Sequence, residues 1–330
     1  MWTDDALHGI GRSEREEFGL ALVDLASTFP KLLVLDGDLA NSTRADIFAA
    51  AQPSRFLQLG IAEQNMIGVA AGLATQGFLP VVTTFACFAV YRALDQVRVL
   101  VAQPRLNVKI VGGYSGLLTG VTGKTHQAID DLAIMRGIPG MVVIAPADDL
   151  ETRAALGAAL RHDGPVYLRL TRDPGPRIRQ AAAEFEIGRA VHLRQGRDVT
   201  VFATGQQTAR VLQAANLLRP RGIEALVVHL PTMKPLDVEA IVRSSRATGL
   251  VVTSEEHQTT GGLGGAVSEV LGEHSPLPIL RLGIRDVWGE SATNDDLLEK
   301  HGLTARRTAE AIEDFVRRHQ SLNKHARARV

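Results

Sequence analysis

The chain has 330 residues, enough for two domains with a large buried core. Its 36 basic side chains balance 36 acidic ones, so net charge gives no reason to expect nucleic acid or an anionic membrane surface as a partner. The single cysteine, Cys87, excludes a disulfide scaffold and favours a reducing compartment, so we expect a cytoplasmic protein.

The first half of the chain alternates between predicted strands and predicted helices. Hydrophobic spacing predicts helices over residues 13–27, 61–74, 88–102, 127–136 and 148–160, and strands over residues 32–35, 56–59, 81–85, 108–111, 141–145 and 166–170. This alternation is typical of a doubly wound α/β domain with a parallel sheet, which we place at residues 1–180. Residues 64–91 are uncharged, but polar residues and Pro80 interrupt them, so we expect buried elements rather than a membrane span.

The alternation restarts after residues 173–183, a segment rich in Pro, Arg and Ala that is typical of a linker. Strands are predicted over residues 199–203, 225–230, 249–254 and 279–282, and helices over residues 208–218, 236–244, 263–271 and 308–318. We therefore expect a second, smaller doubly wound α/β domain at residues 188–330.

One carboxylate, Glu63, lies at the predicted strand-to-helix junction within residues 57–74. Ligands bind at such junctions in α/β proteins, although a glutamate there can also merely complement the helix dipole. The segment GIAEQNMIGVAAGLA around Glu63 resembles the glutamate segment of the transketolase and deoxyxylulose-phosphate synthase families, which use thiamine diphosphate. The resemblance implies that Glu63 is catalytic, because the family glutamate hydrogen-bonds the aminopyrimidine of the cofactor and promotes deprotonation of its thiazolium carbon.

Two further segments resemble cofactor-binding parts of transketolases. Phe85, Phe88 and Tyr91 match the F-x-x-F-x-x-Y segment, whose aromatic rings surround the aminopyrimidine, and the resemblance makes Phe88 the stacking ring. The segment DGDLANST matches the loop that approaches the thiazolium ring, where Asp38 and Leu39 would contact the cofactor. Without the other motifs, these patterns are also typical of a helical core stripe and of a solvated turn.

Residues that handle protons and substrate follow from the same resemblance. Thr125-His126-Gln127 resembles the G-x-T-H-Q segment, which implies a catalytic, proton-handling role for His126. Ser42 and Arg172 match residues that bind the substrate phosphate, and Arg15 matches a second such arginine, for which Arg12 is a near competitor. A guanidinium suits this task because its fork binds an oxyanion bidentately.

A nucleotide phosphate loop is excluded at Gly123-Lys124-Thr125, because that motif needs glycine five residues earlier and position 118 is leucine. The second half also resembles the family, since SEEHQTTGGLGGAVSE is similar to its carboxy-terminal E-E-H…G-G-x-G segment. In the family this domain is mainly structural, so we assign no catalysis to His257. The resemblance therefore extends over nearly the whole chain.

A full transketolase carries an additional amino-terminal domain, the PP domain, whose GDG…N motif holds magnesium and the diphosphate. Here residues 36–39 are DGDL, and we expect no space before them for that domain. The resemblance therefore implies the C-terminal subunit of a split transketolase, with no metal ligand of its own. A separate PP-domain subunit would hold Mg²⁺ and the diphosphate, and a homodimer of this chain would lie within a heterotetramer.

Two departures from the family concern the substrate. Tyr114 stands where transketolases have a histidine that helps bind the phosphate or sugar hydroxyls, and Thr122 stands where they have an acidic residue that contacts an acceptor hydroxyl. Lys124 adds a cation to the same loop, so these three residues are candidates for substrate binding. We predict a modified ketose or acceptor, branched, deoxygenated or carrying a different anion.

The implied reaction is transfer of a two-carbon ketol unit from a ketose or ketose phosphate to an aldose. Glu63 would activate the cofactor and His126 would move protons. Three alternatives stay open: a subunit similar to the β subunit of a 2-oxoacid dehydrogenase, a subunit similar to deoxyxylulose-phosphate synthase, and a regulatory remnant without activity.

Overall fold

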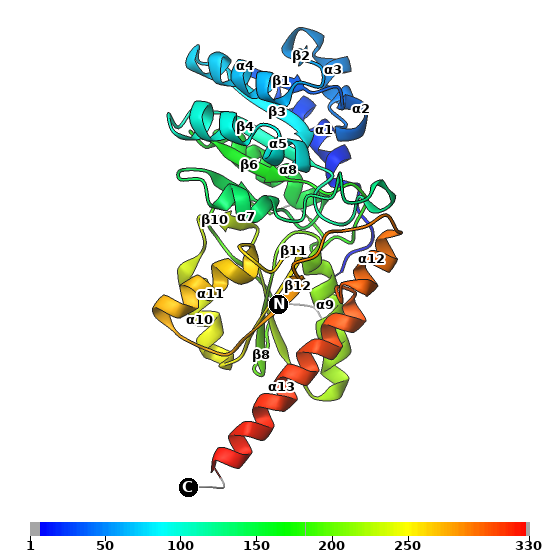
Figure 1. Cartoon of the computed structure of the whole chain (residues 1–330), viewed down its shortest axis with the longest axis vertical. Helices are drawn as coiled ribbons and strands as arrows, with labels where there is room; N and C mark the ends of the chain where they lie inside the picture. Colours follow the sequence, from blue (N-terminus) through cyan, green and yellow to red (C-terminus); the bar gives the residue numbers. More distant parts are fainter. Residues whose placement is uncertain (1–6, 182, 328–330) are drawn as a thin grey trace.

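The structure, a computed structural model, describes residues 7–181 and 183–327, so the outermost residues of both predicted domains lie outside the described part. Two α/β halves are stacked along the long axis of the molecule (Figure 1). The doubly wound α/β prediction is confirmed: parallel strands form the centre of each half and helices cover them.

The first half is built on a sheet whose central strands are buried. Its strands are β1 (Leu32–Asp36), β2 (Phe56–Gln58), β3 (Leu79–Phe85), β4 (Lys109–Gly113), β5 (Val142–Ile144) and β6 (Val166–Arg169). Its helices are α1 (Glu14–Leu25), α2 (Ala40–Thr43), α3 (Asp46–Ala51), η1 (Pro53–Arg55), α4 (Glu63–Thr75), α5 (Ala86–Tyr91), α6 (Leu94–Gln96), η2 (Val97–Ala102), η3 (Gly120–Thr122), α7 (Asp131–Arg136) and α8 (Asp149–Arg161).

Side chains of consecutive strand residues enter different cores, because a strand alternates its faces. Val34 packs with Phe18 of α1, whereas the next residue, Leu35, packs with Met66 of α4. Helices α1 and α8 therefore cover one face of the sheet, and α4, α5 and α7 cover the other. The fully buried strand β3 lies between these two layers.

The second half has a five-stranded sheet in the order β12-β11-β8-β9-β7. Its strands are β7 (Val191–Arg194), β8 (Val199–Ala203), β9 (Ala225–His229), β11 (Val251–Gln258) and β12 (Ile279–Ile284). Its helices are α9 (Gln207–Leu218), η4 (Arg219–Arg221), α10 (Val238–Thr248), α11 (Leu263–His274), α12 (Asn294–Lys300) and α13 (Ala305–Arg327). Helix α13 packs against α9, and its C-terminal end projects beyond it (Figure 1).

One short strand of the second half joins the sheet of the first. Strand β10 (Thr232–Lys234) pairs antiparallel with β5, at the edge of a seven-stranded sheet in the order β10-β5-β6-β4-β3-β1-β2. The other neighbouring strands of this sheet pair in parallel. The two halves therefore share main-chain hydrogen bonds as well as side-chain contacts.

Several predicted elements differ from the structure. The helix predicted over residues 88–102 is wrong as a single element, because Ala93 leaves helical geometry (φ −113°, ψ 10°) and separates α5 from α6 and the π-helical η2. The helix predicted from Gln127 begins at Asp131, since Ala128 bridges to Ser115 as a strand residue would. The loop predicted after β1 contains the short helix α2.

Candidate active site

Four adjacent parallel strands end at the same edge of the first sheet. Asp36 ends β1, Phe85 ends β3, Gly113 ends β4 and Arg169 ends β6. The strand register places Phe85 opposite Gly113, and Asp36 opposite the residue two before Phe85. The loops after these strands carry most of the predicted site residues, so the topology alone gathers them.

Glu63 is the first residue of α4 and its side chain is 4% exposed. Its Oε1 accepts a hydrogen bond from Nη1 of Arg92 at 2.9 Å. Within the described part of the chain, no hydrogen bond reaches its second carboxylate oxygen, Oε2. A nearly buried carboxylate with one oxygen unused can accept a further charge-assisted hydrogen bond from a ligand.

Four rings form a cluster that Arg92 links to this carboxylate, because the Cζ of Arg92 lies 3.9 Å from the ring centroid of Phe88. The centroid of Phe85 lies 4.1 Å from that of Tyr114 and 5.7 Å from that of Phe88, with each pair nearly parallel. His126 meets Phe85 and Phe88 edge-on, at 5.9 and 5.5 Å. The structure therefore brings together residues from three separate segments predicted for the site.

Tyr91, the third predicted aromatic residue, is oriented differently. Its ring is half exposed, and its hydroxyl donates to Asp130. Burial and this bond to Asp130 raise the pKa of Tyr91. Within the described residues, Tyr91 has no ring contact with Phe85 or Phe88.

The loop after β1 is ordered by a residue that sequence reasoning did not select. Oδ2 of Asp36 accepts hydrogen bonds from the backbone of Leu39 at 2.9 Å and Ala40 at 3.1 Å, and from Nε2 of Gln58 at 2.7 Å. Burial raises the pKa of Asp36. Asp38 is exposed with φ +65°, while Leu39 packs against the ring cluster. An aspartate that ends a buried strand before a turn is the signal that could have identified Asp36.

Two guanidiniums flank the ring of Tyr114. Nη1 of Arg15 donates to the hydroxyl of Tyr114 at 2.9 Å and to the carbonyl of Ser42 at 2.8 Å, and its Nε donates to the carbonyl of Arg172 at 2.9 Å. The Cζ atoms of Arg15 and Arg172 lie 5.3 and 5.4 Å from the ring centroid. Ser42 thus contributes its backbone to this cationic group.

The remaining residues predicted to bind substrate, Thr122 and Lys124, are exposed. Thr122 ends η3 and donates from its hydroxyl to the carbonyl of Thr119 at 3.1 Å. Lys124 is exposed, and Nδ1 of His126 lies 2.9 Å from the hydroxyl of Thr125. The two departures from the family pattern therefore occupy distinct places: Tyr114 inside the ring cluster and Thr122 at the exposed edge.

The second half of the chain holds the loop that carries Tyr114. Oε1 of Glu256, at the end region of β11, accepts hydrogen bonds from the backbone N–H groups of Leu117 and Leu118. Arg169 donates to the carbonyl of Glu256 at 3.1 Å and pairs with the buried Asp131 at 3.0 Å. Burial raises the pKa of Glu256. Sequence reasoning missed this support, because its partners lie far apart in the chain.

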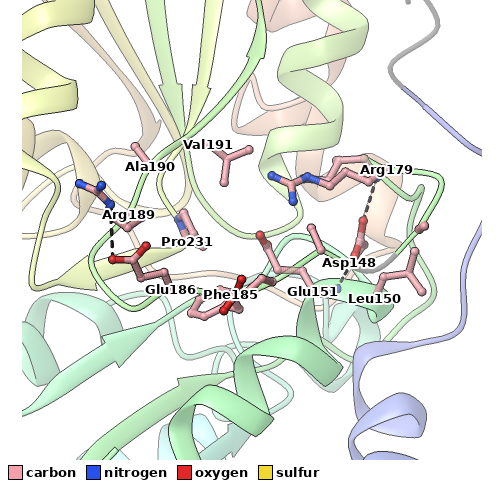
Figure 2. Close-up of a pocket in the computed structure, with 14 residues that line it drawn as sticks. Asp148, Leu150, Glu151, Arg179, Phe185, Glu186, Arg189, Ala190, Val191 and Pro231 are labelled. Carbon is pink, nitrogen blue, oxygen red and sulfur yellow. Dashed lines mark hydrogen bonds and ion pairs between the residues drawn. The ribbon is translucent and has the colours of Figure 1, made fainter. Parts of the chain in front are cut away.

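A separate cavity of about 180 Å³ lies between the first turn of α8, the linker and the start of β7 (Figure 2). Asp148, Glu151, Arg179 and Phe185 are among the residues around it. None of its lining residues belongs to the predicted site. The cavity is therefore not the place where Glu63 acts.

The described residues contain no group of three or more His, Cys, Asp or Glu side chains arranged to hold a metal ion. Among their helices, none is both long and apolar enough to cross a membrane.

Known families match both halves of the chain. Residues 12–176 match the pyrimidine-binding domain of transketolase, and residues 188–307 match the transketolase C-terminal domain. The fold is thus that of the pyrimidine-binding and C-terminal parts of a transketolase. The chain belongs to the transketolase family.

Three individual proteins similar to this chain show which type of transketolase it resembles. The chain is 44% identical to a 6-deoxy-6-sulfo-D-fructose transketolase subunit of Clostridium sp. MSTE9, over 92% of this chain and 94% of that protein. It is 42% identical to a putative transketolase C-terminal section of Methanocaldococcus jannaschii, over 94% of this chain and 99% of that protein. A solved split-gene transketolase, described as an inactive β4 tetramer, superimposes with a TM-score of 0.87 at 48% identity, over 92% and 98% of the two chains.

These relatives identify the chain as a transferase subunit of the split transketolase type. Family membership implies dependence on thiamine diphosphate, and a split subunit implies a separate partner chain.

Proposed function

We propose that this chain provides the part of a transketolase active site that receives the aminopyrimidine of thiamine diphosphate. The observation that carries the proposal is the buried carboxylate of Glu63, joined through Arg92 to the ring of Phe88, which in turn contacts the rings of Phe85 and His126. A carboxylate with one oxygen unused and an adjacent aromatic ring are the two groups that an aminopyrimidine needs, one for a ring nitrogen and one for its face.

Polar atoms at the strand ends also fit a polar cofactor. Among the described residues, Oδ1 of Asp36 and the hydroxyls of Thr83 and Thr84 are buried without a hydrogen-bond partner. Buried polar atoms usually find a partner, so these atoms favour a bound polar group. The described residues offer no cluster for a metal, and we therefore assign Mg²⁺ and the diphosphate to a separate PP-domain subunit.

When bound, the cofactor supplies the carbanion chemistry of ketol transfer. In our proposal Glu63 holds the aminopyrimidine through its free carboxylate oxygen, and Phe88 stacks on the ring while Phe85 and Tyr91 line it. Leu39 supports the cofactor from the opposite loop, next to Asp38. His126 lies in van der Waals range of the ring cluster and is placed to give and take protons at the substrate oxygens.

We propose a ketose with a terminal anion, phosphate or sulfonate, as donor and an aldose as acceptor. Arg172 supports this, because its Nε is buried without a hydrogen-bond partner, with only a long ion pair of 3.8 Å to Asp173. Its Cζ and that of Arg15 lie 5.4 and 5.3 Å from the ring centroid of Tyr114. Two guanidiniums at one ring favour an oxyanion. Ser42, Thr122 and Lys124 complete the proposed substrate contacts. The sulfonated sugar in the name of one relative is consistent with a tetrahedral anion other than phosphate.

The assembly we propose contains two copies of this chain, as a homodimer, and two PP-domain subunits. The β4 tetramer of the similar split-gene transketolase is described as inactive, which is expected if that chain alone lacks half of its site. The domain ranges 1–180 and 188–330 remain our proposal for its two units. We also propose that the enzyme works in carbohydrate metabolism in the cytoplasm, where the buried, unpaired Cys87 would stay reduced.

The test uses this chain mixed with the product of a neighbouring gene that encodes a GDG…N domain. Calorimetric titration with thiamine diphosphate and Mg²⁺ should show binding in the mixture and none to this chain alone. Ketol transfer should fall at least about 100-fold in Glu63→Gln. Glu269→Gln is the matched control, because Glu269 also pairs with an arginine but is 62% exposed at the surface. Tight binding to the single chain would contradict the split site.

A screen of substrates with the same mixture distinguishes ketol transfer from the alternative reactions. Release of carbon dioxide from pyruvate would favour a deoxyxylulose-phosphate synthase or 2-oxoacid dehydrogenase type of reaction. Cofactor binding to neither sample would favour a regulatory remnant.

A further inference from the structure

We infer that Arg92 is a positioning residue that sets Glu63 and Phe88 in the arrangement that receives the aminopyrimidine. The inference rests on the proposed function and adds to it a residue that no motif selected. The guanidinium of Arg92 contacts residues of two different elements, α4 and α5.

Arg92 directly follows α5 and touches both residues at once. Its Nη1 lies 2.9 Å from Oε1 of Glu63, the first residue of α4, and its Cζ lies 3.9 Å from the ring centroid of Phe88 in α5. A planar guanidinium can donate hydrogen bonds in its plane and stack with its face. Arg92 uses both properties, so it fixes the distance between a carboxylate and a ring that belong to separate helices.

The local backbone explains how Arg92 reaches this position. It is the C-cap of α5, and the helical path is interrupted at the next residue, Ala93, which is fully buried. The break that contradicts the predicted continuous helix therefore lies beside Arg92. The buried Ala93 anchors the chain at this point, while the Arg92 side chain stays 47% exposed.

The charge of Arg92 matters because Glu63 is nearly buried. A buried carboxylate without a partner is strongly disfavoured, and the helix N-terminus supplies only a partial positive charge. Arg92 binds Oε1 and leaves Oε2 for a ring nitrogen. Loss of Arg92 would free the Glu63 side chain to turn towards water, and would remove one face contact of Phe88.

The experiment measures the dissociation constant of thiamine diphosphate, with Mg²⁺, in the mixture of this chain and its PP-domain partner. Arg92→Ala should raise that constant at least tenfold. Arg92→Lys should recover part of the affinity, because it keeps the charge but cannot stack and donate together. Arg98→Ala is the matched control: Arg98 lies in η2, pairs with Asp95 of α6 and is 55% exposed, so its loss should leave the constant unchanged.

A double-mutant cycle separates positioning from general damage. If Arg92 acts through Glu63, the pair Glu63→Gln with Arg92→Ala should bind the cofactor about as weakly as Glu63→Gln alone. Fully additive effects, or an Arg92→Ala constant within twofold of wild type, would overturn the inference. If Arg92→Ala does not assemble with the partner, Arg92→Lys decides the matter. A dissociation constant for Arg92→Lys equal to that of wild type would then overturn the inference. Absence of binding by the wild-type mixture would refute the proposed function itself, and the inference with it.

Discussion

Glu14 provides a test of how burial controls the pH dependence of stability. It lies in the first turn of α1, is 1% exposed, and accepts a hydrogen bond from the backbone of Thr171 at 2.6 Å. Its other oxygen, Oε1, is buried without a hydrogen-bond partner. Burial raises the pKa of Glu14 from 4.5 to about 8, in spite of the bond to Thr171, which lowers it.

The sign of the effect follows from proton binding. Between the two pKa values the folded chain holds a proton that the unfolded chain has lost, so folding is favoured at low pH and loses stability as the pH rises. The contribution is complete below the unfolded pKa of 4.5 and is lost as the pH rises through about 8. The full shift corresponds to about 5 kcal/mol, of which about 3 kcal/mol falls between pH 5 and pH 8.

Replacement of Glu14 by glutamine removes the titration and keeps the shape of the side chain. The free energy of unfolding of Glu14→Gln, relative to wild type, should therefore increase by about 3 kcal/mol from pH 5 to pH 8. Urea unfolding followed by circular dichroism, at one fixed protein concentration, measures this difference directly. Glu16→Gln, in the same helical turn but only half buried, is the matched control. Parallel curves for wild type and Glu14→Gln would refute the reasoning.

Three other changes test contacts of the fold. Asp131→Asn should destabilise the chain by about 3 to 5 kcal/mol in urea unfolding, because it leaves the 4% exposed side chain of Arg169 with a buried unpaired charge. Gly116→Ala should lower kcat/KM of the assembled enzyme about tenfold or more, because Gly116 has φ +71° and an added Cβ would lie 2.1 Å from Oε1 of Glu256; unchanged kinetics would mean that the loop position is unimportant. Arg55→Ala should lower the melting temperature and reduce the free energy of unfolding by about 3 kcal/mol, because it removes hydrogen bonds to three carbonyls in the segment from the end of α1 to the start of β1. Arg44→Ala, which loses only an exposed ion pair, is the control.

The sequence allowed prediction of the elements that hydrophobic spacing defines. Strand β3 and helix α4 lie within one or two residues of their predicted positions, because β3 is buried along its whole length and the buried residues of α4 recur at helical spacing. Strand β10 was missed because three residues carry no period, and its role depends on the edge of β5 in the other half. The predicted helix 88–102 failed at Ala93, where packing rather than local preference sets the backbone.

Residues of the candidate site could be predicted where they belong to a short sequence motif. Glu63, Phe88 and His126 could be selected from local sequence, and the structure gathers them at one edge of the sheet. Arg92 and Glu256 could not, because each acts on a residue from another element. Such support is a property of the fold, and no local pattern indicates it.

The position of β10 has a consequence for the order in which the chain is synthesised. The outer edge of β5 receives its partner only when residues 232–234 have been made, roughly 90 residues after β5 itself. At translation rates of about 5–20 residues per second, that edge waits several seconds with unpaired main-chain groups. A nascent first half is therefore exposed to edge-to-edge association. A fragment ending at the linker would keep the unpaired edge of β5 permanently. Expression of the first half alone should succeed better if the TMK strand is grafted onto its end.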